Sequence, residues 1–388
     1  MSSSGGNLAA FFLAVALLIL AGCAPLRSYE SALVLADVGA GDAPSRLKQT
    51  TAAPIRQTIA YRIAGRGHAA DLYLPGAGAP AAGIVIVPGV VPKGKDDPLL
   101  TAFAKTLARA QFAVLAPELP GFRQLTIQPS DARVVADAFA WLTRRPELAP
   151  NGRAGFSAFS YAVGPTLLAA LEPDIRERVR FVVAVGGYHD LAQALRFLTT
   201  GWFEHAGQWH YRQPNEYGQL VFVRSAQPYL SSPDQELLEA MVQRRLLDRH
   251  AELADLATKL TSEGAAVYAL VTNRDPARFK VLAAALPERL RADLAALSLA
   301  DKDLSQLAAR LILVHGKTDS LIPYPESIAL AGAAPPNQAR LYLIERLLGH
   351  VDLSPEPILT PAFWHQDLPD ILRLGTAIYH LLGEREDR

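Results

Sequence analysis

The most diagnostic stretch of this chain is RLILVHGKTDSLIP, which occupies residues 310–323. It opens with an apolar run rich in β-formers, turns at Gly316, presents the carboxylate of Asp319 and ends in an apolar-proline segment typical of a helix start. A carboxylate just after a buried strand stands at the strand's carboxyl end, where it can orient an imidazole. Taken alone, Asp319 is also compatible with an ordinary turn residue bonded to nearby backbone. That interpretation does not explain the whole stretch.

Strands and helices alternate on both sides of this stretch. The segments with the composition of strands are Gly83–Val87, Phe112–Ala116, Arg153–Ala158, Phe181–Val185 and Arg340–Ile344. The segments with helical character are Leu99–Ala110, Asp131–Thr143, Leu167–Leu171, Pro325–Gly332 and Leu368–Leu382. Such alternation predicts an α/β fold with a mostly parallel, doubly wound sheet and right-handed crossovers. Before it, Gln57–Tyr61 and Asp71–Leu74 flank a Gly-Arg-Gly turn at residues 65–67, as in a β-hairpin.

A long segment interrupts this alternation between Phe181–Val185 and Arg310–Val314. It contains helical stretches such as Glu236–Leu256 and Arg278–Leu297, and Ala266–Val271 is the one convincing strand candidate within it. A helical insert between two strands of such a sheet lies where a cap over a binding site would lie. We therefore predict a helical cap at about residues 190–305.

Two serines compete for the turn after the strand at Arg153–Ala158. A nucleophilic serine on a strand-to-helix turn needs small residues two positions before and after it. Ser160 has Ala158 and Ala162 at these positions, whereas Ser157 has the bulky Phe159 on one side. Pro165 is also easier to place near the first turn of a helix opened at Ser160 than deeper in a helix opened at Ser157. We therefore favour Ser160, although a plain helix N-cap would explain such a serine equally well on its own.

His350 follows the strand at Arg340–Ile344 and stands behind Gly349, on a loop from which an imidazole can reach over the sheet edge. Ser160, Asp319 and His350 thus occur in the order Ser, Asp, His, and each follows an apolar β-rich run. Among nucleophilic triads this order is typical of one architecture. We expect these three side chains to form a catalytic triad.

These segments resemble the α/β-hydrolase superfamily over about residues 57–382, with the insert set aside. The resemblance implies an oxyanion hole made of two backbone N–H groups, that of Tyr161 after the nucleophile and that of Val90 after the first core strand. The chain departs from the family at Pro88, where a His often precedes Gly89, and in the alanines that replace the glycines around Ser160.

Carboxylic ester hydrolysis through an acyl-enzyme is the default reaction for such a triad, with a small acyl compound as substrate. A peptidase or a lactonase is compatible with the same residues, because fold and triad do not select the substrate. The departures at Pro88 and around Ser160 also leave open a binding protein that kept the fold without turnover. A lid-gated lipase is a narrower alternative, motivated by the Trp-rich insert.

Other polar motifs carry weaker signals. His189 and Asp190 follow the strand at Phe181–Val185 and are candidate substrate contacts at the pocket mouth. His205 and His210 stand among aromatic residues without zinc-protease spacing, so we expect apolar packing there rather than a metal site. No GxGxxG, P-loop or CxxC motif occurs, and we predict no cofactor. Lys plus Arg and Asp plus Glu number 38 each, which implies no basic face for nucleic acid.

The N-terminal region has the pattern of a secretion signal. Residues 9–20, AAFFLAVALLIL, form an apolar run too short to span a bilayer comfortably, and they lead into Leu20-Ala21-Gly22-Cys23. Cys23 is the only cysteine of the chain, and its context resembles the lipobox of bacterial lipoproteins. The resemblance implies a signal peptide at residues 1–22, acylation of Cys23 and membrane attachment through that lipid. Ala24 in place of Asp favours the outer over the inner membrane.

The expected organisation follows from these observations. Residues 1–22 are a signal peptide, residues 23–54 a lipidated tether, and residues 55–388 a hydrolase domain that contains the cap. Within the tether, residues 31–38 are compatible with a short helix. The mature chain is long enough to bury a large apolar core without disulfides.

Overall fold

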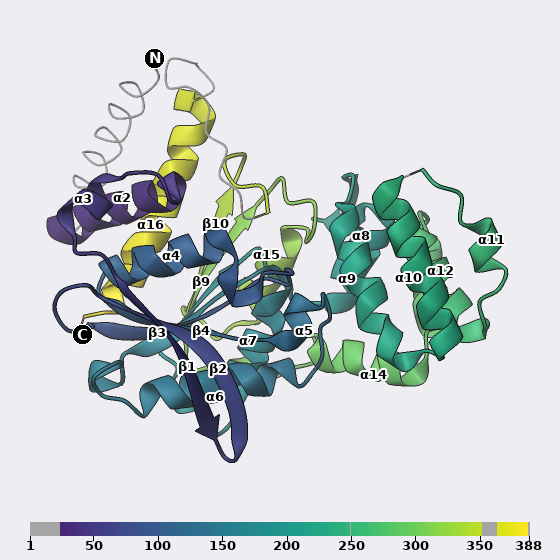
Figure 1. Cartoon of the computed structure of the whole chain (residues 1–388). Coiled ribbons are helices and arrows are strands. Elements are labelled where there is room, and N and C mark those ends of the chain that lie inside the picture. Colours follow the sequence, from purple (N-terminus) through teal and green to yellow (C-terminus); the bar gives the residue numbers. More distant parts are fainter. Residues whose placement is uncertain (1–23, 249, 351–362, 387–388) are drawn as a thin grey trace.

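The structure is a computed structural model that describes residues 24–248, 250–350 and 363–386. An eight-stranded sheet forms its centre, in the order β1-β2-β4-β3-β5-β6-β9-β10 (Figure 1). The strands are β1 (Ile55–Ile63), β2 (Arg66–Leu74), β3 (Ala82–Val87), β4 (Phe112–Pro117), β5 (Ala154–Phe159), β6 (Phe181–Val185), β9 (Arg310–Gly316) and β10 (Ala339–Ile344). From β4 to β10 all neighbouring strands are parallel, and β1 and β2 join as an antiparallel hairpin. The predicted mostly parallel sheet is confirmed.

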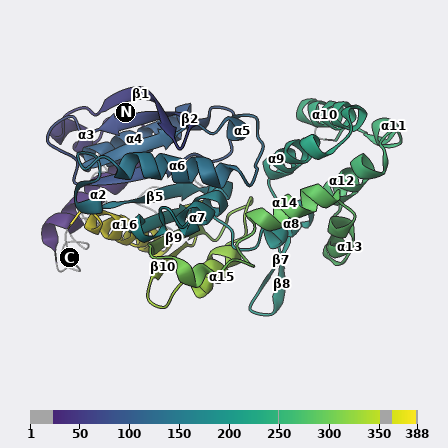
Figure 2. The same cartoon turned by 90° about the horizontal axis from the view of Figure 1, so that it is seen from below.

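Helices cover both faces of the sheet (Figures 1 and 2). One face packs against α6 (Asp131–Thr143), α7 (Val163–Leu171) and α15 (Pro325–Ala333), and the other against α2 (Pro25–Ala40), α4 (Pro98–Arg109) and α16 (Leu368–Gly383). Strand β3 shows the cause: Val85 and Val87 join the first apolar core, while Ile84 and Ile86 join the second. Because successive side chains of a strand point to opposite faces, a strand buried on both faces is an uninterrupted apolar run.

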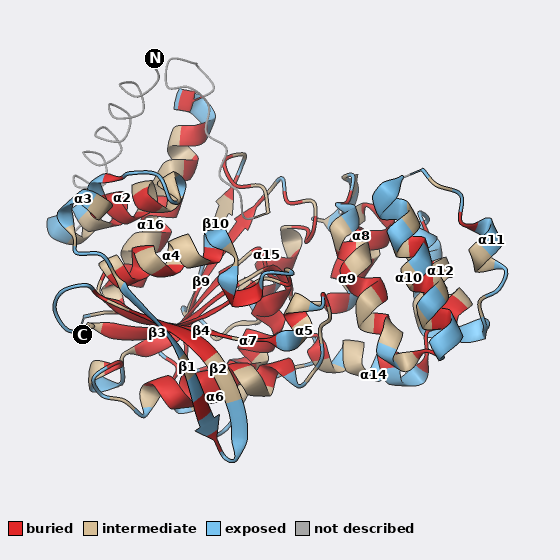
Figure 3. Cartoon of the chain, in the orientation of Figure 1, coloured by how far each residue is buried: buried red, intermediate tan, exposed pale blue. Residues whose placement is uncertain are grey.

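The insert between β6 and β9 is a helical lobe beside the sheet, with mixed burial along its helices (Figure 3). Its elements are α8 (Leu191–Thr200), β7 (Trp202–His205), β8 (Gln208–Tyr211), α9 (Glu216–Ala226), α10 (Ser232–Leu247), α11 (Ala254–Ala257), α12 (Ser262–Thr272), α13 (Phe279–Ala284) and α14 (Glu288–Leu297). An apolar core of its own, which includes Leu198, Phe222 and Val267, holds the lobe together.

Two local predictions for the insert were wrong. Ala266–Val271 is not a strand but lies within α12, because an apolar run of that length fits a buried helix as well as a strand. The hairpin β7–β8 was not expected. Ala206 and Gly207 both have positive φ at its turn, as a tight two-residue hairpin turn requires, but each strand is too short to show a clear alternation.

The segment predicted as a tether is largely folded. Helices α2 and α3 (Arg46–Thr50) cover residues 25–50, and α2 packs against α4 and α16. Buried Asp37 accepts hydrogen bonds from Thr106 at 2.6 Å and from Lys48 at 2.7 Å, and Arg385 pairs with Glu30 at 2.5 Å. Because helix α2 buries polar side chains beside apolar ones, its sequence shows weak periodicity. Cys23 and the predicted signal peptide lie outside the described residues.

Candidate active site

Ser160 stands at a sharp turn between strand and helix. Strand β5 ends at Phe159, and Ser160 has φ 58° before the chain continues into a 3₁₀ turn at residues 160–162 and helix α7. A positive φ is costly for a residue with a Cβ and persists only where the surroundings enforce it. This strained strand-turn-helix geometry is that of a nucleophile elbow.

The neighbours of Ser160 show why small residues are needed there. Ala158 and Ala162 are completely buried. A Cβ on Gly164, one turn into the helix, would collide with the ring of Tyr188. Ser157, the competing serine, pairs with Ile86 and Val183 in the middle of the sheet and is completely buried, and its hydroxyl has no hydrogen-bond partner among the described residues.

Asp319 lies completely buried just beyond the end of β9. Its Oδ1 accepts hydrogen bonds from the backbone N–H groups of Leu321 at 2.7 Å and Ile322 at 3.1 Å. Its Oδ2 accepts one from Nδ1 of His350 at 2.7 Å. Burial alone would raise the pKa of this carboxyl, but the nearby His350 and His315 outweigh it and hold the pKa well below its usual range. The group is therefore an anion that orients His350.

His350 is bonded to Asp319 through Nδ1, which leaves Nε2 as the nitrogen able to accept a proton from a nucleophile. His350 and Ser160 line the same cavity. Gly186, at the end of β6, has φ 62°, and a Cβ there would lie 3.3 Å from Oδ2 of Asp319 and 3.4 Å from the His350 ring. Gly186 thus leaves room for the pair. A glycine directly after the strand at Phe181–Val185 was the available sequence signal.

His315 is a second, completely buried histidine beside Asp319, with its Nε2 3.4 Å from Oδ2. Its Nε2 donates to the carbonyl of Ile322 at 2.9 Å, and its Nδ1 is 2.6 Å from the hydroxyl of Ser327. This pairing assigns Nε2–H as the tautomer. Both nitrogens are occupied, so His315 braces the turn that carries Asp319.

The two predicted oxyanion donors belong to loops that meet at this cavity. Tyr161 follows Ser160, Val90 follows β3, and both residues line the cavity together with Gly89. The carbonyl of Val90 accepts a hydrogen bond from the hydroxyl of Tyr217 at 2.7 Å, and Tyr217 belongs to α9 of the insert. The insert therefore holds the backbone of the residue that we predict to donate to the oxyanion.

A second insert residue supports the turn at Asp319. The guanidinium of Arg212 donates to the carbonyls of Lys317 and Asp319, the latter at 3.2 Å. Next to it, the backbone N–H of Asn215 donates to the carbonyl of Ser320 at 2.8 Å. Sequence reasoning missed Arg212 and Tyr217, because both contacts join segments that are far apart in the chain.

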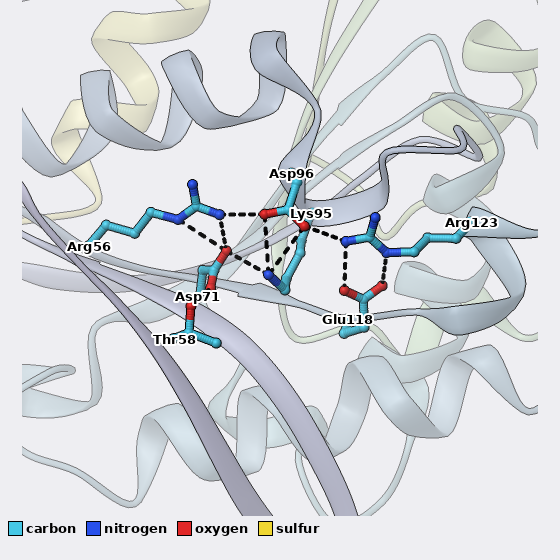
Figure 4. Close-up of polar contacts among 7 residues, drawn as sticks. All are labelled: Arg56, Thr58, Asp71, Lys95, Asp96, Glu118 and Arg123. Atoms are coloured by element: carbon cyan, nitrogen blue, oxygen red, sulfur yellow. Dashed lines mark hydrogen bonds and ion pairs between the residues drawn. The ribbon is translucent and has the colours of Figure 1, made fainter.

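A network of charges anchors the loop after β3 (Figure 4). Its centre is the buried Asp71 of β2, which accepts hydrogen bonds from Lys95 at 2.9 Å, from Thr58 at 2.7 Å and from Arg56. Burial would raise the pKa of Asp71, but these donors hold it below its usual value. Lys95 belongs to the loop that runs from Val90 to α4, so the network ties that loop to the sheet.

The same network extends through Asp96 to a second group of paired acidic and basic side chains. Asp96 bonds Arg56 at 2.5 Å and also bonds Arg123, and Arg123 in turn bonds Glu118 at 2.6 Å. Burial would raise the pKa of Asp96, yet these partners lower it to about 2. The charges near Lys95 are therefore structural partners of one another.

His189 and Asp190, the candidate substrate contacts, are not among the residues that line the cavity of Ser160. Asp190 caps helix α8, with its carboxylate accepting from the N–H of Ala192 at 2.8 Å. The backbone N–H groups of His189 and Asp190 donate to the buried carboxyl of Glu326 at 3.0 and 2.7 Å. Their place is a junction between the sheet and the insert, because Asp190 begins helix α8 of the insert and Glu326 belongs to helix α15 on the sheet.

The aromatic residues near His205 and His210 pack against one another. Phe203 stacks on the His210 ring at 5.5 Å and meets Tyr324 edge-on at 5.9 Å. Within the part of the chain that the structure describes, no cluster of three or more His, Cys, Asp or Glu side chains is arranged to hold a metal ion.

No known family model matches this chain, and no curated protein matches it. Solved structures do. A 2,6-dihydroxy-pseudo-oxynicotine hydrolase is 14% identical, with a TM-score of 0.47, over 85% of this chain and 68% of that one. An esterase from Pyrobaculum calidifontis is 13% identical, with a TM-score of 0.45, over 92% and 91%. An esterase domain from Rhodothermus marinus is 14% identical, with a TM-score of 0.44, over 84% and 97%.

The fold itself is read from the chain's own architecture. A parallel sheet covered by helices on both faces begins with an antiparallel hairpin, carries a strained strand-turn-helix serine at its centre and receives a helical insert after β6. This chain has the α/β-hydrolase fold.

Proposed function

We propose that this chain is a serine hydrolase that cleaves carboxylic esters, with Ser160 as nucleophile, His350 as general base and Asp319 as the residue that orients His350. One observation carries the proposal. Ser160, held at φ 58° on a strained turn, opens on the same cavity as a histidine whose Nδ1 is bonded to a buried carboxylate. A nucleophile and a base at one cavity, with a buried acid bonded to the base, are the functional signature of such catalysts.

The proposed reaction has two halves. His350 accepts the hydroxyl proton of Ser160 at Nε2 while Oγ attacks the acyl carbon, and Asp319 stabilises the resulting imidazolium. Collapse of the tetrahedral intermediate transfers the proton to the leaving alcohol and forms an acyl-enzyme. Water then attacks the acyl-enzyme in the same way and releases the carboxylic acid and free Ser160.

The backbone N–H groups of Tyr161 and Val90 are the proposed donors to the oxyanion. Both residues line the cavity, together with Gly89, which precedes Val90. In enzymes of this kind, loss of one oxyanion donor costs about 2.7–4 kcal/mol of transition-state stabilisation.

The proposed location is the bacterial envelope, with the chain attached to a membrane, the outer more than the inner, by a lipid on Cys23. The support is the apolar segment at residues 9–20 that leads into the lone cysteine. Among the helices of the described residues, none combines the length and apolarity that a membrane crossing needs. Mass spectrometry of the N-terminal peptide from the membrane fraction tests the location, and an unmodified Cys23 contradicts it.

Fluorophosphonate labelling with intact-mass detection tests the catalytic proposal. The wild-type chain and Ser157→Ala should gain one label, whereas Ser160→Ala should gain none. Ser157→Ala is the matched control, because Ser157 lies in the same strand-turn segment but inside the sheet. Labelling that is lost in Ser157→Ala alone, or a folded wild type that never reacts, overturns the assignment. The second result favours a binding protein.

A reactive Ser160 leaves three substrate classes to be compared, namely esters, amides and lactones. An assay of the wild-type chain decides among them, with matched esters, amides and lactones that carry the same acyl group. We expect ester hydrolysis to be fastest, and a higher kcat/KM for the amide or the lactone would replace the esterase proposal by a peptidase or a lactonase.

A further inference from the structure

The cavity that contains Ser160 and His350 has a volume of about 550 Å³. It is larger than attack on an ester carbon requires. From the serine it extends along the face of the sheet that carries Val183 and Val314, between helices α2, α4 and α16. It thus lies beneath α4 and is not confined to the boundary with the helical insert.

The cavity is long in one direction. It is lined by α4 from Leu99 to Leu107 and by α16 from Leu374 to Leu381. With a rise of about 1.5 Å per residue, these segments extend about 12 Å and about 10 Å along the two helices. An extended hydrocarbon advances about 1.25 Å per carbon, because its bonds of about 1.5 Å zigzag at the tetrahedral angle, so this length holds roughly eight to ten methylenes.

The chemistry of the walls changes along this length. Ser160 and His350 supply polar atoms at one place, whereas every described residue of α2, α4 and α16 that lines the cavity is apolar. Two other polar liners already have partners: the carboxylate of Asp97 caps α4 by accepting from the N–H groups of Leu99 and Leu100, and Tyr217 donates to Val90. The helical walls thus favour a hydrocarbon.

An apolar cavity of this size, partly open to solvent, is unusual beside a packed core. Protein cores have few spaces larger than a water molecule, and each unfilled space costs stability. Water gains little in a void that lacks polar partners. Such a space beside a nucleophile is therefore best explained by an apolar occupant that enters with the substrate.

We propose that this cavity binds the acyl chain of the ester, a straight hydrocarbon of about eight carbons or more, with its carbonyl at Ser160 and its tail between α2, α4 and α16. This inference rests on the proposed function and names the substrate class, which is esters of medium- to long-chain fatty acids. Helix α2 then has a second role, because Val34, Leu35 and Val38 form one wall for the tail.

Chain-length kinetics test the inference. The full chain in lipid nanodiscs is assayed with p-nitrophenyl esters from acetate to dodecanoate. Burial of each added methylene should raise kcat/KM by up to about fourfold, until the tail fills the cavity. Val38→Trp, which places an indole in the cavity, should abolish this rise, so that kcat/KM falls far more for dodecanoate than for acetate. Ala36→Trp is the matched control, since Ala36 is also half-buried on α2 but does not line the cavity.

A binding assay separates failure of this inference from failure of the proposed function. Ser160→Ala should bind cis-parinaric acid, a straight-chain fluorescent fatty acid, and release it to dodecanoate. Adding Val38→Trp should weaken binding at least tenfold, whereas Ala36→Trp should not. If Val38→Trp does not fold, Ala377→Phe obstructs the same cavity from helix α16.

The outcomes are distinct. Acetate hydrolysis with no dependence on chain length, or a rise that survives in Val38→Trp, overturns the acyl-chain inference and leaves the esterase intact. Fatty-acid binding that Val38→Trp weakens, in a chain that neither hydrolyses esters nor reacts with fluorophosphonate, supports the cavity assignment and overturns the proposed function. Absence of both binding and hydrolysis in the folded chain overturns both.

Discussion

Tyr217 donates its hydroxyl to the carbonyl oxygen of Val90 at 2.7 Å. The tyrosine belongs to helix α9 of the insert, and Val90 belongs to the loop that follows strand β3 of the sheet. The insert therefore fixes a backbone segment of the core whose N–H is the proposed oxyanion donor. This contact makes the insert a support for the proposed oxyanion donor.

Tyr217→Phe should lower kcat by about tenfold and leave KM within about twofold. Removal of a whole oxyanion donor costs 10²–10³ in kcat, and a donor that is merely less well positioned should cost less. The contact strengthens in the transition state, so the loss falls on kcat. Tyr229→Phe is the control, because it removes another tyrosine hydrogen bond in the insert, that with Asp293. Equal kinetics for the two variants contradict the positioning role.

Features that neighbouring residues determine were predictable from the sequence, and features that depend on contacts between distant segments were not. The strands were predictable because a strand buried on both faces is an apolar run, as in β6, whose predicted bounds match the structure. The turns that carry Ser160 and Asp319 were predictable because each is local to a strand end. Whether these residues perform catalysis is still a prediction.

The unpredicted features depend on contacts between distant segments. Tyr217 and Val90 are 127 positions apart, and Arg212 is 107 positions from Asp319. Nothing near either residue reveals such a contact, since it depends on how the insert packs. Helix α2 was predicted only in part, as a short helix at residues 31–38 within the tether. Its buried polar residues Ser28, Ser31 and Asp37 obscure the apolar stripe of a packed helix.

Asp319→Asn should lower kcat/KM by about 10⁴-fold, as removal of the orienting carboxylate does in serine proteases. The amide oxygen can still accept from the N–H groups of Leu321 and Ile322, which turns the amide nitrogen toward Nδ1 of His350. Nδ1 must then accept, so Nε2 carries the proton and cannot act as a base. Steady-state kinetics check the loss.

The control for Asp319→Asn is Asp234→Asn. Asp234 is also completely buried, but it lies in the insert and bonds Thr261 and Ser231. Its replacement should leave kcat/KM within about threefold of wild type. A similar loss in both variants assigns the effect to a general disturbance of the fold and removes Asp319 from the mechanism.

Lys95→Met should lower the free energy of unfolding by about 1–3 kcal/mol, because it removes a charged donor from the buried carboxylate of Asp71. The cost stays below that of an entirely unpaired buried charge, since Arg56 and Thr58 still bond Asp71. Urea unfolding of both proteins measures the difference. Arg244→Met, which breaks the exposed pair with Asp255, should cost much less stability, because solvent screens that pair. A larger loss of stability in Arg244→Met than in Lys95→Met contradicts the conclusion that the network around Asp71 stabilises the fold.

Glu326 should make the protein less stable as the pH rises from about 4.5 to about 7. Burial raises the pKa of this carboxyl from 4.5 to about 7, although the N–H groups of Asp190 and His189 oppose the shift. Between these two values the folded state holds a proton that the unfolded state has lost. The contribution of Glu326 to the free energy of unfolding is therefore fully present below about pH 4.5 and is lost as the pH rises to about 7.

Glu326→Gln isolates this effect, because a neutral amide keeps an oxygen for the same two N–H groups. The variant should gain stability over wild type on the order of 2–4 kcal/mol between pH 4.5 and pH 8. The difference between the two proteins is the relevant quantity, since Asp131, with a pKa raised to about 6 by burial, contributes the same slope to both. Chemical unfolding at several pH values measures it. A pH-independent difference would mean that Glu326 is ionised throughout and that its two N–H partners outweigh its burial.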